Sequence, residues 1–148
     1  MNIEKMYDSD KFGANLLVFN TNYKKFVNVE LARYDLNLVQ ALSLVFIDKD
    51  GNLNQKILAD KLFLTKGAIT KTVNKLVDDG LVLREKSSKD KRNYVLNTTD
   101  EGRKIIPHIM EINRKWEIEM GLDELPPEFE DIFRHLALRS IELNLKIK

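Results

Sequence analysis

The sequence has no cysteine, little glycine or proline, and no long apolar run. Without cysteine, disulfides, thiolate metal sites and thiol nucleophiles are excluded. The 148 residues include only 6 glycines and 3 prolines, about half the usual share, which favours helices over turn-rich β structure. The longest apolar runs are Leu16 to Phe19 and Leu44 to Ile47, far short of the roughly 20 residues that span a membrane. The start of the chain, with Glu4, Asp8 and Asp10, does not resemble a signal peptide. We therefore expect a cytoplasmic protein without a membrane partner.

The charge is unevenly distributed along the chain. The net charge is only +1, but residues 54–93 contain ten basic and five acidic residues and carry +5. The remaining residues carry −4. A basic centre between acidic ends indicates a localised anion-binding surface. A solvated, lysine-rich face is the alternative interpretation.

Apolar spacing predicts long helices towards both ends of the chain. Between residues 9 and 33, apolar side chains recur at spacings of four and three, which is a helical stripe. Residues 36–47 indicate a second helix, followed by a turn over residues 48–52. Thr99 can cap a long helix that contains Pro107, where we expect a kink, and Pro127 can open the last helix.

The basic centre begins with two short helices. Asn54 can cap the first of them. Its apolar face is predicted to consist of Ile57, Leu58, Ala59 and Leu62. Thr65 can cap the second helix, which we expect to end near Gly80. The predicted buried stripe of this second helix is Ile69, Val73 and Leu76, and the opposite face carries Lys66, Gly67, Thr70, Lys71, Asn74 and Lys75.

A β-hairpin with a basic tip is predicted next. Its strands cover residues 81–85 and 94–98, and residues 87–93 form a polar, basic loop. Helix, turn, helix and hairpin in this order are the elements of a winged helix-turn-helix. The second helix has an apolar stripe that anchors it and a polar stripe free for the major groove. The sequence therefore predicts DNA binding.

The second helix supplies the predicted DNA contacts. Thr65, Lys66 and Lys71 are expected to contact phosphates, because a helix N-terminus and lysines bind anions. Gly67, Thr70 and Asn74 are expected to lie towards base edges. Lys75 repeats the spacing of Lys71 one turn on.

From Leu36 to the end of the long helix, the chain resembles the MarR family of transcriptional regulators. Residues 53–62 are similar to that family's first helix-turn-helix element, and residues 65–76 are similar to its recognition helix. Asp90-Lys91-Arg92, followed by Thr99 and Gly102, resembles the family's wing signature. Thr98 departs from the pattern, because the family more often has an apolar residue there.

The resemblance implies a role for each part of the wing. Basic residues at its tip, here Lys89, Lys91 and Arg92, would enter the minor groove. Asp90 would brace the hairpin through Arg92. The implied fold is mainly α with a small β-hairpin wing, a winged helix-turn-helix with N- and C-terminal dimerisation helices.

Residues 1–148 are then a single MarR-like domain. Residues 36–100 would form the DNA-binding lobe, and residues 1–34 and 101–148 the helical dimerisation lobe. A homodimer presents two recognition helices about 34 Å apart and so reads an inverted repeat in double-stranded DNA. An intramolecular helical cap is the alternative role for the terminal helices.

Family members that sense small aromatic or phenolic compounds suggest an effector pocket where the lobes meet. The candidate residues near that junction are Arg33, Tyr34, His108 and Trp116. Two histidines, His108 and His135, without cysteine do not make a zinc site, so we expect no metal and no cofactor. The sequence contains no catalytic triad and no phosphate loop, so we expect no enzymatic activity.

The sequence thus predicts a homodimeric, sequence-specific DNA-binding regulator, a repressor released by a small-molecule effector. One alternative is a winged helix used as a protein–protein or assembly module, which would expose an apolar or acidic recognition face. Another is an architectural DNA binder that responds to no effector.

Overall fold

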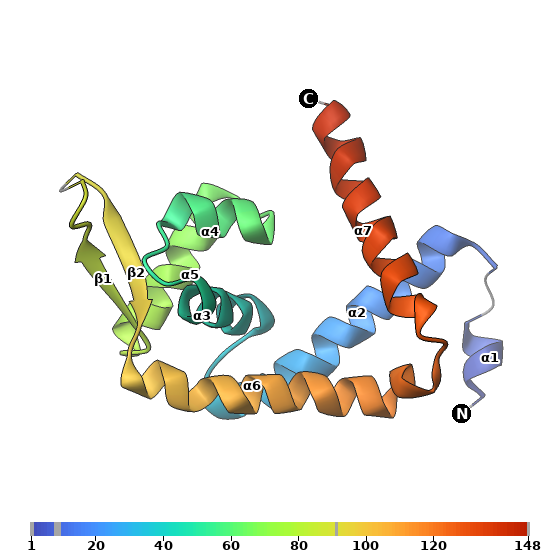
Figure 1. The fold of residues 1–148 in the computed structure, drawn as a ribbon. Coiled ribbons are helices and arrows are strands. Elements are labelled where there is room, and N and C mark those ends of the chain that lie inside the picture. Colours follow the sequence, from blue (N-terminus) through green and yellow to red (C-terminus); the bar gives the residue numbers. More distant parts are fainter. Residues whose placement is uncertain (1, 8–9, 91, 148) are drawn as a thin grey trace. The chain divides into compact units, whose positions relative to one another are not determined.

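The computed structural model describes residues 2–7, 10–90 and 92–147. In this described part the chain is mainly helical, with one two-stranded sheet (Figure 1). The elements in chain order are α1 (Ile3–Met6), α2 (Phe12–Leu31), η1 (Ala32–Tyr34), α3 (Leu38–Asp50), α4 (Gln55–Leu62), α5 (Lys66–Asp78), β1 (Val82–Lys86), β2 (Tyr94–Thr98), α6 (Asp100–Glu119), η2 (Leu122–Glu124) and α7 (Glu128–Lys146). The predicted fold class, mainly α with a small hairpin, is confirmed.

The chain divides into two compact units, Met1–Trp116 and Glu117–Lys148. The core of the first unit lies among α3, α4, α5 and the hairpin. Its most deeply buried side chains include Leu44, Ile47, Leu58, Ile69, Val73, Leu76, Val82 and Leu96. Burying each large aliphatic side chain contributes about 2 kcal/mol. The predicted apolar stripe of α5 is therefore confirmed as the face that anchors this helix.

Side-chain caps begin the helices where the sequence predicts them. The Asn54 Oδ1 accepts the Ile57 N–H at 2.8 Å, ahead of α4. The Thr65 Oγ1 accepts the Ala68 N–H at 3.2 Å, ahead of α5. Each cap satisfies a backbone donor that the first turn of a helix leaves without a partner.

Thr99 joins the start of α6 to the end of the helix-turn-helix. Its Oγ1 accepts the Gly102 N–H at 3.0 Å and donates to the Gly80 carbonyl at 2.7 Å. The Thr99 N–H also donates to the Leu81 carbonyl at 3.1 Å. A β-carbon on Gly102 would lie 2.3 Å from that same Leu81 oxygen. The Thr and Gly of the wing signature thus let the first turn of α6 lie close against Leu81, the residue directly before β1.

The hairpin joins α5 to α6 (Figure 1). Its strands are antiparallel, with a register that runs from Val82 opposite Thr98 to Lys86 opposite Tyr94. An isolated bridge adds Leu53 beside Leu96. The wing is therefore rooted in the core at one end, and its tip is exposed.

Two details differ from the sequence-based predictions. The residues 48–50 were expected in a turn, but α3 continues to Asp50, and the reversal falls at Gly51 and Asn52, both with positive φ. Acidic residues are compatible with a helix, and at the end of α3 the Asp50 carboxylate forms an ion pair with the Lys61 Nζ at 3.0 Å. Ile57 was expected on the apolar face of α4 but is 43% exposed. The neighbouring Leu58 is the residue of this turn whose side chain is buried in the core.

The first unit also contains the contact between α2 and α6. The ring of Trp116 lies edge-on to Phe19 at 5.4 Å and to Tyr23 at 4.7 Å between centroids. The helix α6 contains Pro107 and runs as one helix from Asp100 to Glu119.

The second unit consists of the end of α6, η2 and α7. Pro127 immediately precedes α7, as predicted. All residues of α7 are described, and none of them is buried. Among the described residues, no helix combines the length and the apolar character needed to cross a membrane.

Candidate nucleic-acid interface

The side of α5 opposite its buried stripe is exposed and basic. Lys66 lies at the first position of the helix, directly after the Thr65 cap, and Lys71 follows just over one turn later. Both lysines are exposed, and neither forms an ion pair within the described part of the chain. A β-carbon on Gly67 would meet nothing within 4 Å. The helix start therefore combines free positive charge with accessible backbone, which suits an anionic ligand.

The hydroxyl of Thr70 is engaged within the helix-turn-helix. It donates to the Lys66 carbonyl at 2.8 Å and accepts from the Gln55 Nε2 at 3.2 Å. The proton of this hydroxyl is therefore already used in a hydrogen bond within α5, although Thr70 lies on the predicted DNA-binding face. Gln55 was not a candidate in the sequence, because its link to α5 depends on how the two helices pack.

Asn74 also has a partner outside its own helix. The Arg84 Nη2 on β1 donates to the Asn74 Oδ1 at 2.7 Å. Both residues are exposed. Arg84 is thus part of the basic surface, although the sequence-based site omitted it. The available signal was its period-two spacing from Val82, which lies on the core face of the same strand.

Lys75 differs from the other lysines of α5 because two acids hold it. Its Nζ donates to the Asp35 carboxylate at 2.7 Å and to the Asp79 carboxylate. These hydrogen bonds, first that to Asp35 and then that to Asp79, raise the pKa of Lys75 above its ordinary value. Lys75 therefore stays charged, but its charge is locally compensated, and it does not match the free charge of Lys66 and Lys71.

The tip of the wing is held by short-range hydrogen bonds. The Ser87 Oγ accepts the N–H groups of Lys89 at 3.2 Å and Asp90 at 3.3 Å. The Asp90 carboxylate accepts the Arg92 N–H at 3.0 Å and the Asn93 Nδ2 at 2.8 Å. The expected brace thus uses the backbone of Arg92 and leaves its guanidinium out. Lys91, also a predicted wing contact, lies outside the described residues.

Three of the four predicted effector residues lie around one cavity in the first unit. Arg33, Tyr34 and His108 line a cavity of about 230 Å³. The other lining residues are Glu30, Glu111, Ile112 and Lys115. Trp116 does not line it and packs against Phe19 and Tyr23 instead.

The cavity combines stacked rings with paired charges. The rings of Tyr34 and His108 stack with their centroids 5.2 Å apart. Glu30 accepts from Arg33 at 2.7 Å and lies 3.6 Å from the Lys115 Nζ. A flat ring that carries a polar group fits such a lining, because ring faces, cations and carboxylates are all within reach.

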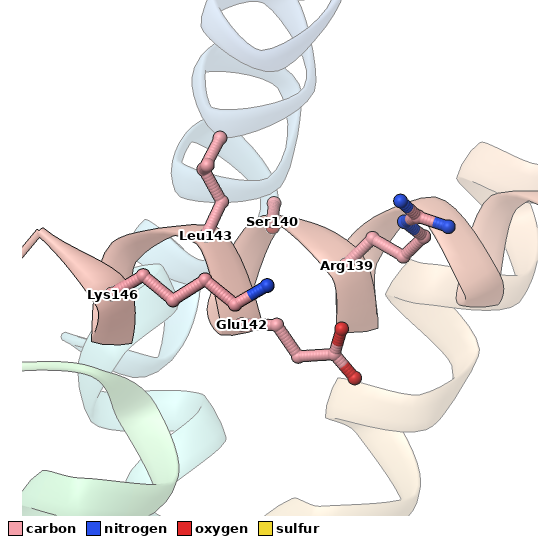
Figure 2. A pocket seen from close by; sticks show the side chains of 5 residues that line it. All are labelled: Arg139, Ser140, Glu142, Leu143 and Lys146. Carbon is pink, nitrogen blue, oxygen red and sulfur yellow. The ribbon is translucent and has the colours of Figure 1, made fainter.

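The second unit contains a hollow of about 240 Å³. Figure 2 shows that its lining side chains, Arg139, Ser140, Glu142, Leu143 and Lys146, all come from α7. One helix cannot enclose a ligand, so this hollow is a groove on the helix surface. Among the described residues, no group of three or more histidines, aspartates or glutamates is placed to hold a metal ion.

Comparisons with known proteins agree with this fold. The model of the MarR family matches residues 36–94. The HTH-type transcriptional regulator SarZ of Staphylococcus aureus (strain USA300) is 34% identical over 113 residues, which cover 76% of this chain and 74% of SarZ. The fold and these matches define the class as winged helix-turn-helix transcriptional regulators. Within that class, the chain belongs to the MarR family.

Solved structures show the same fold. A MarR transcriptional regulator from Methanosarcina mazei Go1 is 25% identical, with a TM-score of 0.75 over 93% of this chain and 99% of that one. A putative MarR family regulator from Listeria monocytogenes, complexed with 26mer DNA, is 20% identical, with a TM-score of 0.78 over 93% and 90%. The relatives are named as transcriptional regulators, in agreement with the expectation that this chain is not an enzyme.

Proposed function

We propose that this MarR-family regulator is a homodimeric repressor that binds inverted-repeat DNA and is released by a small aromatic or phenolic compound. The observation that carries DNA binding is the exposed basic start of α5, where Lys66 and Lys71 lie without ion pairs in the described part of the chain. The structural relative from Listeria monocytogenes was solved with DNA. We also place the protein in the cytoplasm.

In this proposal α5 enters the major groove and the wing reaches the adjacent minor groove. Thr65, Lys66 and Lys71 contact phosphates, and Gly67 lets the backbone approach closely. Thr70 and Asn74 face base edges. In the wing, Lys89, Lys91 and Arg92 contact DNA, while Asp90 holds the loop.

The DNA contact is tested by replacing one free lysine and one distant lysine. We expect Lys66→Ala to weaken binding to the protein's own upstream DNA about tenfold in a band-shift titration, since each phosphate contact adds affinity. Lys49→Ala, at the end of α3, removes the same charge outside the interface. Equal losses for the two variants would mean that only overall charge matters.

Exposed apolar side chains support a homodimer. In α2, Phe12 is 70% exposed and Leu17 is 66% exposed, and in α7 Ile132 is 59% exposed. Further exposed apolar residues of α7 are Phe129, Phe133, Leu136, Leu138, Leu143 and Leu145. So much exposed apolar surface is unusual for a monomer and typical of an interface.

Light scattering tests the dimer. We expect the protein to have twice the chain mass and Leu136→Glu to reduce it to one chain, because a buried charge in an apolar interface is unfavourable. Leu83→Glu is the matched control, since Leu83 is a half-exposed leucine on β1. A monomeric parent protein, or a dimeric Leu136→Glu variant, would contradict this interface.

The cavity beside Tyr34 and His108 supports effector binding. We expect benzoate or phenol to raise the melting temperature of the parent protein and to release it from upstream DNA. Tyr34→Ala removes one of the stacked rings and should abolish both effects, whereas Phe63→Ala, an exposed aromatic residue that does not line the cavity, should leave them intact. An unshifted parent protein would favour the effector-independent architectural binder.

Repression is tested on transcription from the upstream promoter. A dimer bound there would block access of the polymerase, so deletion of the protein should raise expression of a reporter gene. A fall in expression would identify an activator. The assembly-module alternative predicts an apolar or acidic face on α5, and the described face is basic.

A further inference from the structure

The hydrogen bond between Arg84 and Asn74 lies where the core meets the exposed side of α5. Val82 and Arg84 are two residues apart on β1, so their side chains leave the same face of the hairpin. Val82 is buried in the core. Arg84 lies past the edge of that core, and its Nη2 reaches the Asn74 Oδ1 at 2.7 Å. An arginine from the wing therefore engages a side chain of the recognition helix.

This contact determines which group of the Asn74 amide is better able to bond to a DNA base. An asparagine amide has one accepting oxygen and one nitrogen with two donors. The Asn74 oxygen already accepts a charge-assisted hydrogen bond from Arg84, which is stronger than a neutral one. Among the described residues the Nδ2 group forms no hydrogen bond, so it remains a donor. The positive charge beside the oxygen further disfavours a second donor there.

The two purines differ in the major groove in a way that such an amide distinguishes. Adenine presents the N7 acceptor beside the N6 amino donor, and asparagine recognises it with both halves of its amide. Guanine presents two acceptors, N7 and O6. The Asn74 oxygen keeps a second lone pair, but the Arg84 cation beside it opposes the approach of another donor, so donation to guanine is favoured over the two-sided pair with adenine.

We propose that Arg84 is a specificity-determining positioning residue, which fixes the amide of Asn74 so that α5 selects guanine over adenine at one position of each half-site. This inference rests on the proposed DNA binding. Arg84 sets the preference through Asn74, and no base contact of Arg84 itself is required.

Selection from a library of DNA duplexes with a randomised central region tests this role. The Asn74→Ala variant identifies the base position, because the purine preference is lost only at the base pair that Asn74 contacts. At that position we expect the parent protein to prefer guanine. Arg84→Met removes the donor and keeps the length of the side chain, and it should shift the preference about tenfold towards adenine.

Three further variants separate positioning from charge and from folding. Lys86→Met removes a cation two residues further along β1 and should lower affinity without changing the purine preference. Arg84→Lys keeps a donor near Asn74 and should retain the preference for guanine. In an Asn74→Ala background, Arg84→Met should no longer alter any base preference. A melting curve of each variant is needed to check that it is folded.

The outcomes distinguish this inference from the proposed function. A parent protein that enriches no sequence contradicts DNA recognition itself, and the inference fails with it. A parent protein that enriches a motif, with Arg84→Met showing the same purine preference and only weaker binding, overturns the role of Arg84 alone. A shift towards adenine that depends on Asn74 supports it.

Discussion

Gly102, in the first turn of α6, lies close against Leu81 and Thr98 at the base of the hairpin, and replacing it with alanine tests how the wing is anchored. The added Cβ would lie 2.3 Å from the Leu81 oxygen, 2.7 Å from the Thr98 Cγ2 and 3.2 Å from the Leu44 Cδ1. The Leu81 oxygen cannot move away freely, because it also accepts the Thr99 N–H at 3.1 Å. The helix must therefore withdraw by at least about 0.7 Å, the difference between this 2.3 Å approach and the 3.0 Å limit of real Cβ contacts.

The expected cost of Gly102→Ala follows from two opposing effects. Overpacking a tight site costs about 3 kcal/mol at the upper end of its usual range, and the clash with a backbone atom places this site there. Alanine in place of glycine inside a helix returns about 1 kcal/mol. We expect a net loss of about 2 kcal/mol in the free energy of unfolding.

Equilibrium unfolding in urea, followed by circular dichroism, measures this loss. The protein concentration must be the same for all variants, because the stability of a dimer depends on it. Gly67→Ala is the control, since the added Cβ would meet nothing within 4 Å, and the variant should be as stable as the parent protein or slightly more stable. A Gly102→Ala variant as stable as Gly67→Ala would refute the close contact between the first turn of α6 and Leu81.

Three other predictions follow from individual contacts. Lys71→Met should reduce the slope of log affinity for DNA against log salt by about one unit, whereas Lys75→Met should change it little, because Asp35 and Asp79 already compensate Lys75; equal slopes in band shifts would contradict this difference. Thr98→Val should raise the free energy of unfolding in urea by about 1 kcal/mol, since the buried Thr98 Oγ1 has no hydrogen-bond partner among the described residues; a less stable variant would show that the hydroxyl is satisfied. Asn93→Ala should weaken DNA binding about fivefold with an unchanged melting temperature, because it removes one hydrogen bond that holds the wing loop through Asp90. An unaltered affinity would show that the loop does not depend on this hydrogen bond.

Local features of the fold could be predicted from the sequence because they depend on neighbouring residues. The caps at Asn54, Thr65 and Thr99 each bond to a backbone group three residues further on. The buried stripe of α5 follows from helical spacing alone. The end of α3 was missed because acidic residues are compatible with both helix and turn, and only the packing decides.

The candidate site could be predicted only in part. The exposure of Lys66 and Lys71 follows from the position of the apolar stripe. The contacts from Arg84 to Asn74 and from Gln55 to Thr70 join different elements. Their partners depend on distances between packed elements, which no local pattern contains.

The cavity shows the same division. Three of its lining residues, Arg33, Tyr34 and His108, could be predicted because they lie near the junction of the predicted lobes in the sequence. Its charged residues Glu30 and Lys115 were missed because their proximity depends on the packing of α2 against α6. Trp116 was expected to line the cavity, but it packs against Phe19 and Tyr23 of α2 instead. This contact also depends on how α2 and α6 pack.

Binding of the purified protein to its own upstream DNA and to a scrambled duplex, titrated across salt concentrations, tests the central claim most directly. A dimeric regulator that reads DNA through α5 and the wing should bind the upstream DNA more tightly than the scrambled duplex. Its affinity for both should fall steeply as salt rises, because phosphate contacts release counterions. Equal affinity for the two duplexes, or no binding even at low salt, would contradict the account.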